Sequence, residues 1–348
     1  MTKRILGAPI KRVRPEFAYL PARAISRLYG SEPSGVPVAF VVPEGSQGWI
    51  LEGICREIAR YMPASSYVFH DSLRRLPDAQ SYYVAHYALV PELLKLNPRA
   101  WNRRIYTWFT HPDKRLCQRE MVYSLNCTEK VFCTNTVFAH QLKLSGVAEE
   151  KIEVVLGGAD PARFRRHERG SGLIGLCTAY YDRKRPDLML RLIQSMPQQP
   201  FLLLGKGWQE WPGFPHLLAL PNFKYAEAQY EDYPSYYDQM DVFLSVSALE
   251  GGPIPMLEAM MSNVVPVVSR TGFAHDIIKQ GRNGFIFDIE APPEEIASFI
   301  NQALQLKADI RSTVMRYSWE AFSAQIQRAL HVLPERVGAP SAPLPQGI

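Results

Sequence analysis

The sequence predicts an α/β protein built from two doubly wound domains, each a parallel sheet covered by helices. Its 348 residues are enough for two domains of about 150–175 residues each. Hydrophobic residues make up 47% of the chain and charged residues 21%, so two apolar cores can form. Short apolar runs alternate with helical patterns along the chain, which is typical of parallel sheets with helices on both faces.

The first half of the chain holds one series of these elements. Predicted strands lie at 38–42, 66–70, 81–85, 105–110, 130–134 and 151–155, and predicted helices at 49–61 and about 114–124. The pattern then starts again. Predicted strands of the second half lie at 172–178, 201–204, 242–246, 264–268 and 284–287, and predicted helices at 186–194, 233–239, 256–261 and within 294–332.

These series divide the chain into five parts. They are a basic N-terminal arm (1–36), an N-terminal domain (37–160), a C-terminal domain (161–316), a C-terminal helix (317–333) and a tail expected to be disordered because of its four prolines (334–348). Ligands bind at the carboxyl ends of the strands in such sheets, so the predicted site is a cleft between the two domains.

The net charge of +5 is concentrated at the N-terminus. Residues 1–36 carry seven basic and two acidic side chains, and the rest of the chain is neutral overall. This arm also contains Phe17, Tyr19 and Leu20, and it either rests on an anionic membrane surface or forms a solvated extension. We favour the extension because no clean apolar helical face is visible. Nucleic-acid binding is not predicted, since the remaining chain has no basic excess and no such motif.

The cysteines and the hydropathy indicate a cytoplasmic protein. If the basic arm binds lipid, the protein would associate peripherally with the inner face of the membrane. The five cysteines form no C-x-x-C pair, which favours reduced thiols over disulfides or a zinc site. No apolar run approaches the roughly 18–20 residues of a membrane span. The N-terminus does not have the pattern of a secretory signal.

The most informative segment connects a predicted strand to a predicted helix. Glu250 is followed by Gly251-Gly252, which allow a close backbone approach to a ligand, and by residues suited to a helix start, namely Pro253, Ile254 and Pro255. The amino end of the helix suits a diphosphate, while Glu258 could accept hydrogen bonds from ribose hydroxyls and Glu250 could contact another part of the same ligand. The alternative is a solvated loop with two incidental glutamates, which the spacing disfavours.

Several motifs together resemble a known group. Glu250 and Glu258 match the E-x7-E signature of retaining, nucleotide-sugar-dependent glycosyltransferases with the GT-B fold, particularly family 4. The helix and strand after Glu258, the Gly281-Arg-Asn-Gly284-Phe segment and the 155–164 segment are also similar to that family. The resemblance covers about residues 130–330 and implies two Rossmann-like domains facing each other across a cleft.

The resemblance implies roles for individual residues. Glu258 would bind the ribose of the donor and Glu250 the transferred sugar, while Lys184 aligns with a family lysine that helps hold the phosphates. The family's Gly-Arg falls on Thr178-Ala179, so Arg183 is the candidate replacement. Further expected positions are Gly205 and Tyr225 near the nucleotide, His111 near the donor sugar, and a loop for phosphates or acceptor formed by Gly45, Ser46 and Gly48.

The expected reaction moves a sugar from a nucleoside diphosphate to a hydroxyl of a glycan, lipid-linked or small-molecule acceptor, with retention. Lys184 and the helix start would stabilise the charge of the departing diphosphate. No Asp-x-Asp triplet occurs, so we expect neither a metal ion nor another cofactor. A donor-binding protein without turnover and an epimerase of similar architecture are the alternatives. A nicotinamide dehydrogenase is disfavoured because no G-x-G-x-x-G follows a predicted strand.

Overall fold

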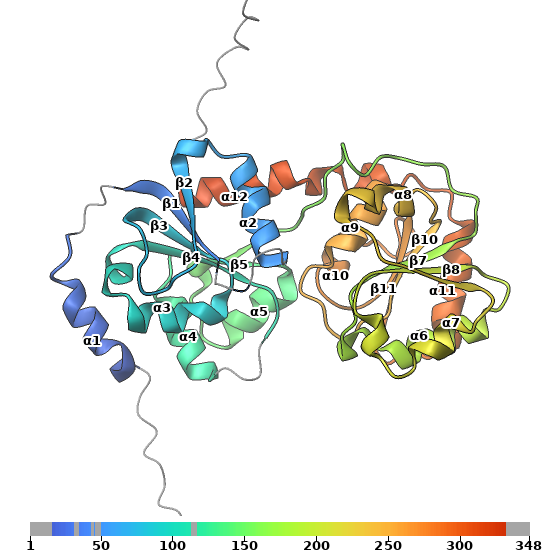
Figure 1. Ribbon diagram of the computed structural model, residues 1–348, viewed down its shortest axis with the longest axis horizontal. Coiled ribbons are helices and arrows are strands. Elements are labelled where there is room, and N and C mark those ends of the chain that lie inside the picture. The colour runs from blue at the N-terminus through green and yellow to red at the C-terminus, as the bar shows by residue number, and fades with distance from the viewer. Residues whose placement is uncertain (1–15, 31–34, 43–44, 46–49, 113–116, 332–348) are drawn as a thin grey trace, which may run out of the picture.

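The computed structural model describes residues 16–30, 35–42, 45, 50–112 and 117–331. Figure 1 shows two α/β domains side by side, joined by chain segments that cross between them. Each domain contains one six-stranded sheet in which every paired strand runs parallel to its neighbours. The predicted fold class is therefore confirmed. The tail at 334–348 lies outside the described residues.

The N-terminal domain has the strand order β2-β1-β3-β4-β5-β6. Its strands are β1 (Val36–Val41), β2 (Tyr67–His70), β3 (Ala79–Val84), β4 (Arg104–Phe109), β5 (Lys130–Cys133) and β6 (Ile152–Val154). Its helices are α1 (Glu16–Ser26), α2 (Ile50–Arg60), α3 (Val90–Leu96), α4 (Gln118–Asn126) and α5 (Thr136–Leu144).

The two faces of this sheet have separate cores because side chains alternate along each strand. Val38 and Phe40 of β1 belong to the cluster beneath α2, whereas Ala39 and Val41 belong to the cluster on the α3 side. With both faces covered by helices, the strands are hydrophobic almost throughout, as expected for a buried parallel sheet.

The C-terminal domain has the strand order β12-β11-β10-β7-β8-β9. Its strands are β7 (Ile174–Cys177), β8 (Phe201–Leu204), β9 (Phe223–Ala226), β10 (Val242–Ser245), β11 (Val265–Ser269) and β12 (Phe285–Phe287). Its helices are α6 (Pro186–Ser195), α7 (Phe214–Leu218), α8 (Tyr233–Tyr237), α9 (Ile254–Met261), α10 (Ala274–Ile277) and α11 (Pro293–Gln305). One extended hydrophobic core joins its sheet to these helices.

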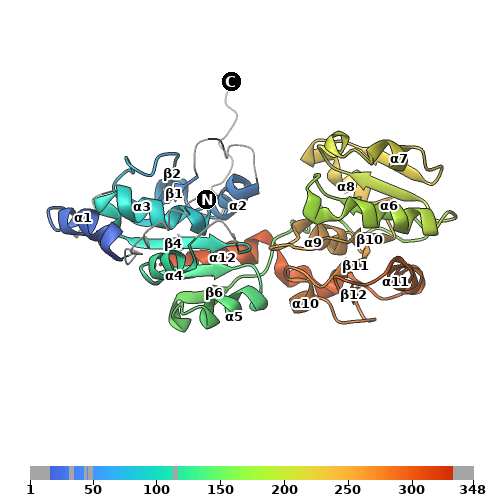
Figure 2. The same cartoon turned by 90° about the horizontal axis from the view of Figure 1, so that it is seen from below.

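The last helix, α12 (Trp319–Leu330), returns to the N-terminal domain, as both views show (Figures 1 and 2). It packs beside α2, and its Trp319, Phe322 and Ile326 belong to the hydrophobic cluster beneath that helix. Ser323 donates a hydrogen bond to the Ile58 carbonyl at 2.7 Å. Just before α12, Ala159 and Ser318 form an isolated parallel β-bridge between the two chain segments that connect the domains. The two domains are thus connected twice.

Most predicted elements lie within a few residues of observed ones, and the differences have physical reasons. The strand β9 was not predicted, because four residues with one exposed lysine carry little hydrophobic pattern. The helices α3, α5, α7 and α10 were also missed; each is short, and α3 and α7 contain proline near their first turn. A helix predicted to start at 114 begins at Gln118, just after residues that are outside the described part.

The expectation of a solvated arm is wrong for residues 16–30. Tyr19 of α1 is completely buried, lies 6.1 Å from Trp101 and 5.1 Å from Tyr123 between ring centroids, and donates a hydrogen bond to Glu120. The sequence pattern hid this helix because apolar residues occur on both of its faces, so no single face stands out. The rest of the arm, apart from 35–36, lies outside the described residues.

Within the described part of the chain, no helix combines the length and the apolar character needed to cross a bilayer.

Candidate active site

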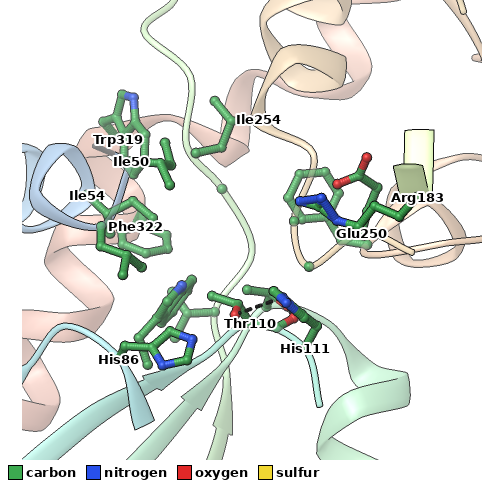
Figure 3. A pocket seen from close by; sticks show the side chains of 18 of the residues that line it. Ile50, Ile54, His86, Thr110, His111, Arg183, Glu250, Ile254, Trp319 and Phe322 are labelled. Atoms are coloured by element: carbon green, nitrogen blue, oxygen red, sulfur yellow. Dashed lines mark hydrogen bonds between the residues drawn. The ribbon is translucent and has the colours of Figure 1, made fainter. Parts of the chain in front are cut away.

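A cavity of about 520 Å³ lies between the carboxyl ends of the two sheets. Loops that follow β3, β4 and β5 line it from the N-terminal domain, and the turn between β10 and α9 lines it from the C-terminal domain. Figure 3 shows the side chains of both domains pointing into this space. The predicted cleft is therefore present, at the edge where parallel sheets bind ligands.

Glu250 and Lys184 form the charged centre of the C-terminal side. The Lys184 ammonium donates a short hydrogen bond to Glu250 Oε1, and both side chains are nearly buried. Lys184 comes from the turn after β7 and Glu250 from the turn after β10, and these two strands are neighbours in the sheet. Buried charges of this kind are tolerated because each neutralises the other.

Gly251 and Gly252 bring backbone into the cavity beside this pair. A Cβ added to Gly251 would lie 2.7 Å from the Thr110 carbonyl oxygen, and one added to Gly252 would lie 2.8 Å from the Phe273 ring. Glycine is therefore required for this close approach. The amide N–H groups of both glycines have no hydrogen-bond acceptor among the residues that the structure describes, so a ligand in the cavity can accept from them.

A second cavity of about 240 Å³ continues from the first into the C-terminal domain. Arg183, Lys184, Thr178 and Ala179 line it after β7, opposite the start of α9 with Pro253, Ile254 and Pro255. Arg183 and Glu250 border both cavities. The guanidinium of Arg183 lies 4.7 Å from the centre of the Tyr181 ring, which holds this cation at the rim.

Glu258 lines neither cavity, and its expected contact with the ribose stays a prediction. It is buried on α9, where it accepts hydrogen bonds from the Tyr230 hydroxyl at 2.6 Å and the Tyr237 hydroxyl at 3.0 Å. Burial raises the pKa of this carboxyl from 4.5 to about 7, although the two tyrosines and Arg163 oppose the shift. Both carboxylate oxygens are therefore occupied by protein groups.

Gly205 and Tyr225 also lie outside the cavities, although both were expected near the nucleotide. A Cβ on Gly205 would lie 1.9 Å from the Thr178 carbonyl oxygen, so this glycine permits the close packing of two loops. The single hydroxyl proton of Tyr225 is shared between the Gly205 carbonyl and the Glu227 carboxylate, at 2.8 and 2.6 Å. The two residues thus tie the ends of β8 and β9 together.

Histidines occupy the N-terminal side of the cavity. His111 follows β4, its Nδ1 lies 3.1 Å from the Thr110 hydroxyl, and its carbonyl accepts a hydrogen bond from Tyr87. His86 follows β3, and its Nδ1 accepts a hydrogen bond from the Ala88 amide at 3.3 Å. That bond leaves the His86 proton on Nε2 in the neutral ring. The sequence analysis missed His86; its place directly after a strand was the available signal.

An apolar wall completes the cavity, and sequence reasoning missed it too. Ile50 and Ile54 come from the start of α2, while Trp319 and Phe322 come from α12 at the other end of the chain (Figure 3). Trp319 packs so closely on the crossing segment that a Cβ on Gly158 would lie 2.2 Å from its ring. Only the return of α12 brings these four side chains together.

Three residues after β5 connect the domains at one side of the cavity. Asn135 donates a hydrogen bond from its side chain to the Gly251 carbonyl at 3.0 Å. The Thr136 amide and hydroxyl donate to the two oxygens of Asp276 on α10, at 3.1 and 2.5 Å. Thr134 lines the cavity beside them. These contacts hold the glycine turn against the N-terminal domain.

The predicted glycine loop is only partly described. Gly45 lines the cavity, whereas Ser46 and Gly48 lie outside the described residues. Across the parts of the chain that the structure describes, no three His, Cys, Asp or Glu side chains are grouped so that they could hold a metal ion.

Two parallel six-stranded α/β sheets that face each other across such a cavity define the GT-B fold, and solved glycosyltransferases share it. Residues 178–319 match the family model of glycosyl transferases group 1. The match begins at the end of β7 and ends at the start of α12, so the C-terminal side of the cavity carries the sequence pattern of that family. No curated protein sequence matches the chain.

Solved structures show the same architecture at low sequence identity. HepE from Anabaena, solved with UDP-glucose, has a TM-score of 0.68 and 14% identity over 85% of this chain and 99% of its own. The lipopolysaccharide outer core galactosyltransferase WaaB has a TM-score of 0.67 and 14% identity over 84% and 99%. Sucrose-phosphate synthase from Thermosynechococcus elongatus has a TM-score of 0.68 and 12% identity over 85% and 98%.

Proposed function

We propose that this protein is a retaining glycosyltransferase of family 4 that moves a sugar from a nucleoside diphosphate sugar to an acceptor hydroxyl. The observation that carries the proposal is the buried Lys184–Glu250 pair beside the unpartnered amides of Gly251 and Gly252, opposite His111 across one cavity. The group 1 match over this side of the cavity supports the proposal. So does the likeness to HepE, which was solved with UDP-glucose and with UDP.

The glycine turn is the proposed seat of the diphosphate. Negative charge grows on the leaving oxygens as the bond to the anomeric carbon breaks, and preorganised donors stabilise it. The amides of Gly251 and Gly252, which have no acceptor among the described residues, lie at this turn together with the amino end of α9 and the cations of Lys184 and Arg183. With these positive groups present, we expect the reaction to need neither a metal ion nor another cofactor.

Glu250 is the proposed contact to the transferred sugar. Its ion pair with Lys184 fixes the carboxylate at the border of both cavities, where sugar hydroxyls can donate to it. His111 approaches from the N-terminal domain and can accept or donate at a neighbouring hydroxyl. For retention, the departing diphosphate oxygen would take the proton of the acceptor hydroxyl on the same face of the sugar.

The apolar wall suggests the class of acceptor. Ile50, Ile54 and Phe322 have no hydrogen-bonding group, and Trp319 offers only its indole N–H. Most hydroxyls of a fully hydroxylated glycan would lose water at this wall without replacement. An acceptor with an apolar portion next to its hydroxyl fits this wall better. Among the acceptors considered, we therefore favour a lipid-linked or other amphiphilic one.

A cytoplasmic location is part of the proposal. All five cysteines are unpaired, and three of them are buried in the two domains, as expected in a reducing compartment. Nucleoside diphosphate sugars fit the same compartment.

A donor-binding protein without turnover is the second candidate, and two observations favour it. The tyrosines Tyr230 and Tyr237 occupy both oxygens of Glu258, and Thr178-Ala179 stands where the family has Gly-Arg. If donor binding does not displace the Tyr230 hydroxyl, the ribose has no acidic partner at this position.

Purified protein tested with a panel of nucleoside diphosphate sugars separates these candidates. A donor should raise the melting temperature by mass action, and sugar labelled in that donor should be hydrolysed or transferred. We expect Glu250→Gln to keep the thermal shift and lose turnover. A shift without turnover would support the second candidate, and no shift with any donor would contradict both.

A further inference from the structure

The two cations on the C-terminal side of the cavity are held in different ways. The Lys184 ammonium is bound to Glu250, and both side chains are nearly buried. The Arg183 guanidinium has no carboxylate partner and no hydrogen-bond acceptor among the residues that the structure describes. Asp182, its neighbour in the chain, accepts a hydrogen bond from the Tyr180 hydroxyl at 2.9 Å instead. The charge of Lys184 is therefore neutralised by the protein, whereas that of Arg183 is available to an anion.

Arg183 has a fixed backbone at a place that both cavities share. Its carbonyl accepts a hydrogen bond from the Ala248 amide at 2.7 Å, which ties the turn after β7 to the turn after β10. The side chain reaches the larger cavity beside Glu250 (Figure 3), and Arg183 also borders the smaller cavity. An anion that lies where the two cavities meet is therefore within reach of this guanidinium.

The ring of Tyr181 supports the guanidinium of Arg183. The Arg183 Cζ atom lies 4.7 Å from the ring centre, within the range of a cation–π contact, and Tyr181 itself lines the smaller cavity. The tyrosine is 44% exposed, so its ring contributes little to the core of the domain. Stacking restricts the long arginine side chain and leaves the N–H groups at the edge of the guanidinium available for hydrogen bonds. This pair is therefore suited to holding an anion.

We propose that Tyr181 is a positioning residue that orients Arg183 to hold the diphosphate of the donor. The proposal rests on the proposed function and deepens it, because the net positive charge at the phosphates then comes from Arg183. Thr178-Ala179 stands where the family has Gly-Arg, so the turn after β7 has no arginine at that position. Arg183 supplies a guanidinium from further along the same turn. Tyr181 orders it before the donor arrives, which lowers the entropic cost of binding.

Calorimetric binding of UDP, dTDP, GDP and ADP to the full chain tests this proposal. For each diphosphate that binds, Arg183→Gln should raise Kd roughly tenfold or more, because a charge-assisted hydrogen bond is lost. Tyr181→Leu should raise Kd about threefold when Arg183 is present and leave it unchanged in the Arg183→Gln background. Tyr181→Phe keeps the ring and should restore the Kd of the unchanged protein.

Tyr61→Leu is the matched control, because Tyr61 is 36% exposed, has Arg60 at 5.7 Å from its ring centre and lines neither cavity. It should leave Kd unchanged. The proposal is overturned if Tyr181→Leu binds like the unchanged protein. It is also overturned if Tyr181→Leu weakens binding equally with and without Arg183, because the ring would then contact the nucleotide itself. Both results leave the proposed function intact, whereas binding of none of the four diphosphates would overturn the two proposals together.

Discussion

The two sides of the cavity differ in chemistry and in how the chain builds them. The C-terminal side is charged, and it comes from two short segments, at 178–184 and 250–255. The N-terminal side combines histidines with an apolar wall, and its residues come from the ends of β1, β3, β4, β5 and β6, from α2 and from α12. A local motif therefore encodes the side that we propose for the donor, whereas the topology assembles the side that we propose for the acceptor.

The largest effect is expected from the charged side. Glu250→Ala removes the partner of a nearly buried ammonium, and breaking a buried pair in this way costs about 3–5 kcal/mol of folding stability. The loss of the sugar contact should also lower transfer roughly 10²–10³-fold. Chemical denaturation and turnover of a labelled donor measure the two effects.

Asp288→Ala provides the control for this prediction. Asp288 pairs with Arg270 at 2.9 Å in the same domain, but both side chains are mostly exposed, so little change is expected. Equal losses of folding stability and of transfer activity in the two variants would show that the burial of the Lys184–Glu250 pair does not increase its contribution.

The pH dependence of stability tests the buried Glu258. Its pKa is raised from 4.5 in the unfolded chain to about 7 in the folded protein, so the folded state holds the proton more tightly. The stability from this group is complete below pH 4.5 and is lost as the pH rises through 7, by roughly 3 kcal/mol at most. Denaturation of the unchanged protein and of Glu258→Gln at several pH values should show this loss only in the former. Parallel pH curves would contradict the assignment.

A smaller effect is expected where the two sides touch. The added methyl group of Gly251→Ala would lie 2.7 Å from the Thr110 carbonyl oxygen and should push the domains apart, lowering kcat/KM about tenfold. Gly53→Ala in α2 is the matched control, because no atom lies within 4 Å of its added Cβ and alanine favours a helix. If both variants keep full activity, the close approach of the domains is not needed for turnover.

The smallest effect is expected on the apolar wall. Ile50 is largely exposed and borders both cavities, so Ile50→Ser should leave folding stability unchanged and change the KM for the donor less than that for the acceptor. The KM for an amphiphilic acceptor should rise several-fold, since about one aliphatic contact is lost. Leu218→Ser, at an exposed position that lines neither cavity, should change neither constant. A rise in the donor KM alone would mean that the wall faces the donor.

The same contrast explains what could be predicted from the sequence. The strand before Glu250 and the helix after it were predictable, because apolar runs, two glycines and two prolines are local signals. The tyrosines that occupy Glu258 were not, because Tyr230 is 28 residues away and only the packing of α8 and α9 brings it close. Trp319 and Phe322 were not predictable as cavity residues, since no pattern in α12 indicates that it returns to the first domain. The helix α1 escaped prediction because its outward face is as apolar as its inward one.

The return of α12 has a consequence for synthesis on the ribosome. The hydrophobic cluster between α2 and the first sheet includes Phe322 and Ile326, so this domain lacks part of its interior until nearly the whole chain has emerged. The C-terminal domain uses residues from about 159 to 317 and is complete earlier. The usual order, in which the domain translated first also folds first, is therefore reversed for the final step. A nascent chain stalled before residue 319 should expose the apolar surface of α2 to chaperones and proteases.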